Sequence, residues 1–302
     1  MISVKPMLLL RTMLFVPGNN MRMLHKAGTL DADAVIIDLE DAVPMEDKET
    51  ARIFIRDGIE TARKGESMVF VRVNGLTTGL TGQDLEESVC EGLDGIVLPK
   101  AESEKDILDT EAILERIEKQ KGLKAGSITI LPILETAKGV LNAAEVASAS
   151  KRVAGLSFGA VDFTRDLGVN LSKEGVELSF PRAYIALAAK AAGMPAVDTV
   201  FINIMDKEGL IRDSKTAKQL GFSGKLLIHP NQIQPVNEVF SPTQQEVEYC
   251  KRAVTAFKEA QAQGAGAISL DGKMIDYANY RQAEDTLAIW DAIIKRKKTA
   301  TT

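Results

Sequence analysis

The sequence predicts an α/β protein, a TIM (β/α)8 barrel followed by a C-terminal helical extension. Three observations support this fold class. Eight short apolar and β-branched runs recur between residues 12 and 228, helical patterns separate them, and polar residues follow most of them. Strands that alternate with helices indicate a parallel sheet, and eight such strands are the number that closes a TIM barrel.

Most of the runs are nearly continuous in apolar residues, as is typical of parallel strands covered on both faces. The intervening helical patterns are amphipathic: in residues 105–119, Ile107, Leu114 and Ile117 fall on one stripe with charges opposite. A doubly wound open sheet is the structural alternative. The expected strands are Thr12–Val16, Ala34–Leu39, Met68–Val73, Asp94–Leu98, Ile128–Leu134, Val153–Phe158, Ala196–Phe201 and Lys225–Ile228.

Beyond the expected barrel, the chain continues for a further stretch of mainly helical pattern. We expect the barrel to occupy residues 1–240 and the extension to occupy residues 241–302. Gln244–Gln263 and Tyr280–Lys295 have strong helical patterns. The glycine-rich segment between them, Gly264–Asp276, is expected to be irregular and flexible rather than a packed strand.

The composition excludes several classes of protein. Of the 302 residues, 45% are hydrophobic and 26% are charged, with a net charge of −5, which is ordinary for a globular protein and unfavourable for general nucleic-acid binding. Two cysteines and two histidines exclude a disulfide framework or a zinc cluster, so a metal site would consist mainly of oxygen ligands and favour Mg²⁺ or Mn²⁺. No apolar run is long enough to span a membrane, and the expected location is the cytoplasm.

Polar residues follow the ends of the expected strands, where the active sites of TIM barrels lie. Because the carboxyl ends of parallel strands meet on one face, these side chains are expected to converge. They are Asp38–Asp41, Arg72, Asn74, Lys100, Glu135, Asp162, Asn203 and His229.

Two carboxylates and one arginine in this set are candidates for chemistry. Glu135 and Asp162 are a candidate Mg²⁺ pair, although either could instead pair with a basic residue such as Arg165 or Lys138. Arg72 would bind an anion or form an internal ion pair with the acidic run 38–41.

Two further features carry weaker signals. The PGNN turn at residues 17–20 precedes a helix and could hold a phosphate or carboxylate group. His229 is either a general base or a structural residue.

Eight segments occur in one order between residues 11 and 276, and together they resemble the citrate lyase beta-subunit family, which includes citryl-CoA, malyl-CoA and citramalyl-CoA lyases. The resemblance implies a TIM barrel, a Mg²⁺ ion and an acyl-CoA substrate cleaved by a retro-Claisen reaction to acetyl-CoA and a 2-oxo acid. The segments are RTMLFVPGNNMRMLHKA, DADAVIIDLEDAV, VRVNG, GIVLPK, LPILETAKGV, GAVDFTRDLG, IHPNQI and DGKMID.

The resemblance implies roles for individual residues. Glu135 of ETAKG and Asp162 of GAVDF match the Mg²⁺ ligands, and Arg72 of VRVNG matches the arginine over the thioester and carboxylate. Phe15 and Lys26 match positions that contact coenzyme A.

For Asp276 of DGKMID, the resemblance implies an acid that a neighbouring subunit contributes to the site, usually in a trimer; the structural alternative is an N-cap for the helix from Tyr277. It therefore implies a homo-oligomer, a trimer or a hexamer, whose extension packs on or completes a neighbouring site. Citrate lyase alpha and gamma subunits are further candidate partners.

Three segments bear on the choice of substrate. PGNN stands where malyl-CoA lyases have PGSR, and GAVDF and IHP are more similar to the malyl-CoA and citramalyl-CoA lyases than to the best-known citrate lyase beta chains. The sequence therefore leaves the acceptor acid open. An aldolase acting on free hydroxy-oxo acids and a non-catalytic acyl-CoA-binding subunit are the alternative functions.

Overall fold

The structure is a computed structural model, and it describes residues 8–299. The chain folds into two compact units, of which one is Leu10–Asn237 and the other contains, among the described residues, 8–9 and 238–299. Each unit has its own packing and is described separately below.

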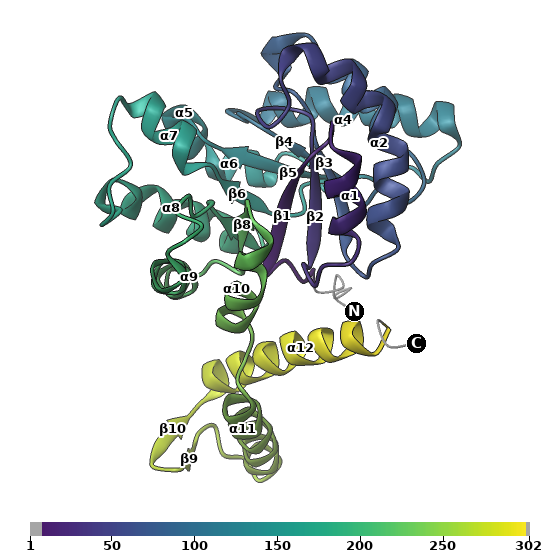
Figure 1. Ribbon diagram of the computed structural model, residues 1–302. Helices are drawn as coiled ribbons and strands as arrows, with labels where there is room; N and C mark the ends of the chain where they lie inside the picture. Colours follow the sequence, from purple (N-terminus) through teal and green to yellow (C-terminus); the bar gives the residue numbers. More distant parts are fainter. Residues whose placement is uncertain (1–7, 300–302) are drawn as a thin grey trace. The chain divides into compact units, whose positions relative to one another are not determined.

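The unit Leu10–Asn237 is a closed barrel of eight parallel strands in sequence order, in which the last strand pairs with the first (Figure 1). This confirms the predicted TIM barrel and overturns the open-sheet alternative. All eight expected runs form strands, several of them shorter than expected. The strands are β1 (Thr12–Pro17), β2 (Ala34–Asp38), β3 (Met68–Arg72), β4 (Gly95–Leu98), β5 (Thr129–Leu134), β6 (Leu156–Phe158), β7 (Ala196–Asp198) and β8 (Gly224–Leu227).

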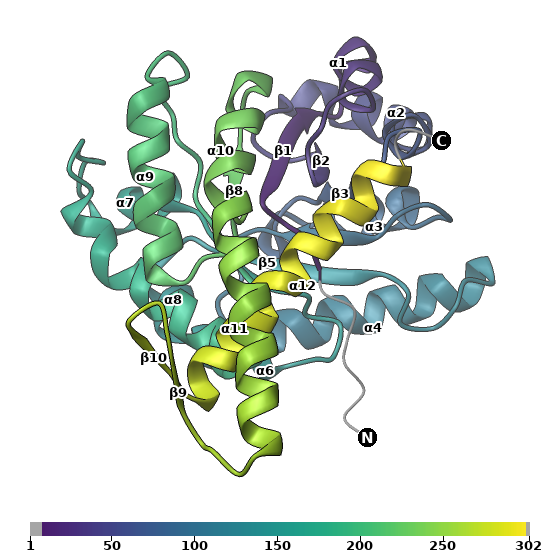
Figure 2. The same cartoon turned by 90° about the horizontal axis from the view of Figure 1, so that it is seen from below.

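Helices lie outside the strands and cover them, as Figure 2 shows from below. In the helix Glu104–Lys121 (α4), Ile107, Leu114 and Ile117 are fully buried, which confirms the predicted apolar stripe. Ser103 and Asp106 form a capping box at the start of α4, and Gly122 ends the helix in a left-handed conformation. The helices are α1 (Met21–Ala27), α2 (Lys48–Arg63), α3 (Thr81–Ser88), α4 (Glu104–Lys121), α5 (Ala137–Leu141), α6 (Ala143–Ser148), α7 (Ala160–Leu167), α8 (Ser179–Ala191), α9 (Lys207–Leu220) and α10 (Ile233–Phe240).

A buried ion pair between Glu118 and Arg152 ties α4 to the chain that enters β6. Arg152 donates from Nη1 and Nη2 to the two carboxylate oxygens of Glu118, each over 2.8 Å, and both side chains are almost fully buried. The main-chain N–H groups of Gly126 and Ile128 also donate to Glu118. Burial raises the pKa of Glu118, but Arg152 and the two N–H groups outweigh it and lower the pKa to about 2.

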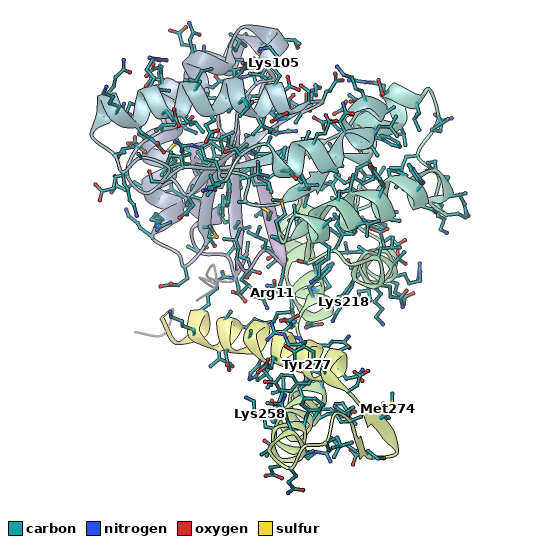
Figure 3. All side chains as sticks on the ribbon, turned by 180° about the vertical axis from the view of Figure 1, so that it is seen from behind. Arg11, Lys105, Lys218, Lys258, Met274 and Tyr277 are labelled. Atoms are coloured by element: carbon teal, nitrogen blue, oxygen red, sulfur yellow. The ribbon has the colours of Figure 1, made fainter. Side chains whose placement is uncertain are left out.

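The second unit contains α11 (Gln244–Ala262), a two-stranded hairpin and α12 (Tyr277–Thr299). Cys250 and Ala253 of α11 pack against Ala283 of α12 in a small core. Figure 3 labels Lys258 on α11, Met274 on the hairpin and Tyr277 at the start of α12.

The expectation of an irregular segment at Gly264–Asp276 is wrong, because β9 (Ile268–Leu270) and β10 (Lys273–Ile275) pair as antiparallel strands. Asp271 and Gly272 form the two-residue turn, with φ of 50° and 75°. Positive φ at both positions fits the primed hairpin turns that the Asp-Gly dipeptide favours.

Among residues 8–299, no helix is both long enough and apolar enough to cross a membrane.

Candidate active site

A cavity of about 350 Å³ lies at the carboxyl ends of the barrel strands. One part of its wall is charged and comes from the β2, β3, β5 and β6 ends, and another part is mainly apolar and comes from the β7 and β8 ends. The charged residues are Asp38, Asp41, Arg72, Glu135 and Asp162; the β7 and β8 ends contribute Thr199, Val200, Leu226 and Ile228.

Glu135 follows β5 directly, and its side chain is almost fully buried, with 3% of the residue exposed. Its Oε1 atom accepts a hydrogen bond of 2.8 Å from the main-chain N–H of Lys100. Burial is the main cause that raises the pKa of Glu135 to about 8, and the negative charges of Glu40 and Asp162 add to this effect. Surplus negative charge at a buried carboxylate fits the position of a divalent cation, which would offset the repulsion.

Asp162 lies in the first turn of α7 and forms an ion pair of 2.9 Å with Arg165. This is one of the alternative partners that the sequence suggested, but the Arg165 side chain is 75% exposed, and such exposed pairs contribute little. Lys138 pairs with Glu102 instead. Asp162 therefore keeps its place in the cavity wall beside Glu135.

The two carboxylates would fit a Mg²⁺ site if other oxygen atoms completed it. Among residues 8–299, no group of three or more His, Cys, Asp or Glu side chains could hold a metal ion. Mg²⁺ does not require such a group, because it is usually bound by one or two carboxylates together with water and substrate oxygens.

Arg72 is placed by the pairing of β2 with β3, which sets Asp38 opposite Arg72. Its Nε atom donates to Asp38 over 2.7 Å, Nη2 also donates to Asp38, and Nη1 lies 3.0 Å from Glu40. The guanidinium carbon lies 4.6 Å from the centre of the Phe15 ring. Burial lowers the pKa of Arg72, but the surrounding carboxylates raise it above its ordinary value. Arg72 thus forms the internal ion pair, one of the two alternatives that the sequence left open, and it also lines the cavity.

Glu40 and Lys100 form a second ion pair that the sequence did not predict. Lys100 Nζ donates to Glu40 Oε1, and the Lys100 backbone has a left-handed φ of 52°. Such a φ is uncommon for lysine and marks a strained position of the kind found at functional sites. Both residues were visible as polar strand-end positions, but no sequence signal joined them.

The structure brings four of the predicted site residues together, namely Phe15, Arg72, Glu135 and Asp162. Lys26 is exposed on α1 and does not line the cavity. Asp276 lies in the second unit, where its Oδ1 accepts a hydrogen bond of 3.0 Å from the N–H of Asn279. It therefore serves as the N-cap of α12, the structural alternative given above.

Two weaker candidates have structural roles in local turns. The side chain of Asn20, in the PGNN turn, accepts from the N–H of Met23 and caps α1. His229 Nδ1 accepts from the N–H of Asn231 over 3.2 Å, which fits the structural reading of this histidine.

Comparison with known proteins assigns the chain to a family. The model of the HpcH/HpaI aldolase/citrate lyase family matches residues 11–230. Citrate lyase subunit beta of Leuconostoc mesenteroides subsp. cremoris is 39% identical over 93% of both chains. The (3S)-malyl-CoA thioesterase of Cereibacter sphaeroides is 36% identical over 94% of this chain and 95% of its own.

A solved structure agrees with these relatives. The CitE protein of Mycobacterium tuberculosis, in complex with magnesium, acetoacetate and coenzyme A, superimposes with a TM-score of 0.73 at 30% identity. The match covers 92% of this chain and 96% of that one. The chain therefore belongs to the HpcH/HpaI aldolase/citrate lyase family.

Proposed function

We propose that this protein is a Mg²⁺-dependent acyl-CoA carbon–carbon lyase of the citrate lyase beta type. Its substrate would be citryl-CoA, citramalyl-CoA or malyl-CoA, each a 3-hydroxyacyl thioester with a carboxylate on the hydroxyl-bearing carbon. The observation that carries the proposal is the meeting of Glu135, Asp162 and Arg72 in one cavity of a chain with citrate lyase beta relatives.

Glu135 and Asp162 are the residues that would hold Mg²⁺, with Mn²⁺ as a substitute. When bound, the metal would polarise the hydroxyl and carboxylate oxygens of the substrate and lower the pKa of the hydroxyl group. The burial of Glu135 supports this assignment, because a buried carboxylate without a cation is costly.

In the reaction, the hydroxyl group loses its proton to a base and becomes a carbonyl as the neighbouring C–C bond breaks. The electron pair of that bond passes into the thioester and forms an enolate, while the 2-oxo acid is released. Arg72 would stabilise the developing negative charge on the enolate oxygen, since a fixed guanidinium in a sheltered site needs little reorganisation. Asp276 would then give a proton to the enolate carbon, which yields acetyl-CoA.

Coenzyme A would be held by Phe15 and Lys26, which lie on β1 and α1 respectively. Phe15 contributes an apolar ring to the cavity, and the exposed ammonium of Lys26 suits a phosphate group. The solved CitE complex contains both magnesium and coenzyme A, which supports a CoA thioester as substrate.

We further propose that the active form is a homo-oligomer, a trimer or a hexamer, in which a neighbouring subunit supplies Asp276. Asp276 belongs to a different compact unit from the barrel residues, which would suit its supply by a neighbouring subunit. Citrate lyase alpha and gamma subunits are additional candidate partners, because relatives of this chain are citrate lyase beta subunits.

An assay of acetyl-CoA release from citryl-, citramalyl- and malyl-CoA, with and without EDTA, tests the function. We expect release from at least one thioester and its loss when EDTA removes the metal. Cleavage of free hydroxy-oxo acids without CoA would identify an aldolase instead. Binding of all three thioesters without turnover would identify a non-catalytic subunit.

The malyl-CoA thioesterase relative gives a specific reason to test hydrolysis as a second function. Hydrolysis breaks the C–S bond and gives free CoA and a hydroxy acid, whereas the lyase reaction leaves the thioester intact. The same assay separates the two reactions if free thiol is followed beside acetyl-CoA.

A further inference from the structure

We propose that Gly159 is a positioning residue that gives the Glu135 carboxylate the space it needs to reach a metal ion. The inference rests on the proposed metal site and adds to it a residue that contributes no side chain.

Gly159 and Glu135 are brought together by the pairing of two strands. Leu134, the last residue of β5, pairs with Phe158, the last residue of β6. The residues that follow, Glu135 and Gly159, therefore leave the barrel side by side. A methyl carbon on Gly159 would lie 2.5 Å from Oε2 and 2.7 Å from Cβ of Glu135. Both distances are far below ordinary van der Waals contact.

The backbone at Gly159 has little freedom to move away from such a clash. Its N–H donates to the carbonyl of Leu134 over 3.1 Å, and its carbonyl accepts from the N–H of Phe163 over 3.0 Å. The next N–H, from Ala160, donates to Thr199 Oγ1 over 2.9 Å. Relief must therefore come mainly from Glu135, whose Oε2 atom can rotate away but whose Cβ atom moves only with its own backbone.

The Glu135 carboxylate is restrained on its other side as well. Its Oε1 atom accepts from the N–H of Lys100 over 2.8 Å, so a movement away from Gly159 would disturb that hydrogen bond. The Lys100 N–H therefore holds the carboxylate in the space that Gly159 leaves open.

Gly159 also immediately precedes α7, which carries Asp162 in its first turn. Any backbone shift that relieved the clash would displace the second carboxylate. An added methyl group must therefore disturb one metal ligand or the other. The φ of Gly159 is −110°, which alanine can adopt. The expected effect of the substitution is therefore a steric clash, without strain in the backbone dihedral angles.

The first experiment measures Mn²⁺ binding to the full-length protein by electron paramagnetic resonance of the free ion. Substitution of residues that position metal ligands typically weakens binding about 10- to 100-fold. We expect Gly159→Ala to raise the Mn²⁺ dissociation constant at least about 10-fold. Gly82→Ala is the matched control, because Gly82 lies in α3 and a methyl group there meets no atom within 4 Å. An unchanged dissociation constant in Gly159→Ala would overturn the inference.

The second experiment measures urea unfolding midpoints without metal and asks whether the clash is with Glu135. Gly159→Ala is made in the wild-type protein and in a Glu135→Gly variant, which lacks both contacting atoms. In the Glu135→Gly background, we expect Gly159→Ala to lower the urea midpoint by at most half as much as in the wild type. A smaller fall should persist, because the added methyl carbon would still lie 2.9 Å from Ile133 Cγ2. Equal falls in both backgrounds would overturn the inference.

If Gly159→Ala alone does not fold, the variant that carries both Glu135→Gly and Gly159→Ala can be compared with Glu135→Gly. This comparison still tests whether the clash is with Glu135. A double variant that unfolds at a midpoint close to that of Glu135→Gly supports the clash, and one that does not fold contradicts it. A wild-type protein that binds no Mn²⁺ would refute the proposed function, while the unfolding comparison would still test the contact between Gly159 and Glu135.

Discussion

Arg72 and Asp38 face each other across adjacent strands, and the guanidinium donates hydrogen bonds from both Nε and Nη2 to the carboxylate. Asp38 is fully buried, so this pair fixes the direction of the guanidinium within the cavity wall. A fixed cation at this point can meet developing negative charge without reorganising, which is the property proposed for Arg72.

Replacing Arg72 with lysine should preserve the charge but lose the bidentate hydrogen bonding to Asp38. We expect kcat to fall by about 10²- to 10³-fold, as for loss of one oxyanion donor, with a smaller change in KM. Steady-state kinetics of acetyl-CoA release measure both constants. Arg116→Lys, at an exposed ion pair with Glu86, is the control and should behave as wild type. An effect on KM alone would argue against transition-state stabilisation by Arg72.

Glu135→Ala and Asp162→Ala should each abolish turnover in a way that excess Mg²⁺ does not restore. Each variant removes one of the two carboxylates that we propose as ligands of the metal. Binding of Mg²⁺ should raise the melting temperature of the wild type, and this rise should be lost in each variant. Glu145→Ala removes an exposed glutamate from α6 and serves as the control. Normal turnover in either variant would refute the metal assignment.

Lys26→Ala should raise KM for the thioester and leave kcat nearly unchanged. A contact with a phosphate far from the reacting atoms stabilises the ground state and the transition state equally. Lys105→Ala, at an exposed lysine of α4, provides a comparison for the loss of one surface charge. A large fall in kcat at constant KM would be incompatible with a phosphate contact.

Asp276→Asn should separate catalysis from helix capping. Asparagine is as good an N-cap as aspartate, so α12 should keep its cap while the proton donor is lost. We expect near-normal Mg²⁺ and substrate binding and a loss of most turnover. Circular dichroism and acetyl-CoA release, measured together, distinguish the two roles.

A mixing experiment asks whether Asp276 acts across a subunit boundary. Asp276→Asn and Arg72→Ala proteins, combined under conditions that allow subunit exchange, should regain part of the activity. Some shared sites would then contain both wild-type residues. Hybrids that exchange fully and remain inactive would show that Asp276 acts within its own chain or has no catalytic part.

The ion pair of Glu118 and Arg152 should make stability depend on pH. The folded-state pKa of Glu118 is lowered from 4.5 to about 2, so its contribution is present above pH 4.5 and is lost as the pH falls toward 2. The shift corresponds to roughly 3 kcal/mol at neutral pH. Urea unfolding of wild type and Glu118→Gln should therefore differ most at pH 7 and converge toward pH 2. A difference that stays constant over this range would contradict the lowered pKa.

The strands were predictable because each is a short apolar run bounded by helical patterns, and parallel strands in a barrel have that signature. The hairpin at Ile268–Ile275 was not predicted, although Asp271-Gly272 is a strong turn signal. The GAGA sequence that precedes it is typical of a flexible segment and obscures this turn signal.

The placement of Glu135, Asp162 and Arg72 at one cavity followed from their positions after strands, together with the family resemblance. The ion pair of Lys100 with Glu40 could not be predicted from the sequence, because it joins side chains from the ends of β4 and β2. The closeness of Gly159 to Glu135 likewise depends on strand register, which single-sequence patterns leave undetermined.

The charged residues of the cavity wall and the mainly apolar residues at the ends of β7 and β8 lie on different strands. The carboxylates and arginine come from the ends of β2, β3, β5 and β6, whereas β7 and β8 contribute Thr199, Val200, Leu226 and Ile228. Changes in the size of these four residues can reshape the space offered to an acyl group while leaving the ionic groups untouched. Substitutions at these four positions are therefore where a redesign of this chain for a different acid should begin.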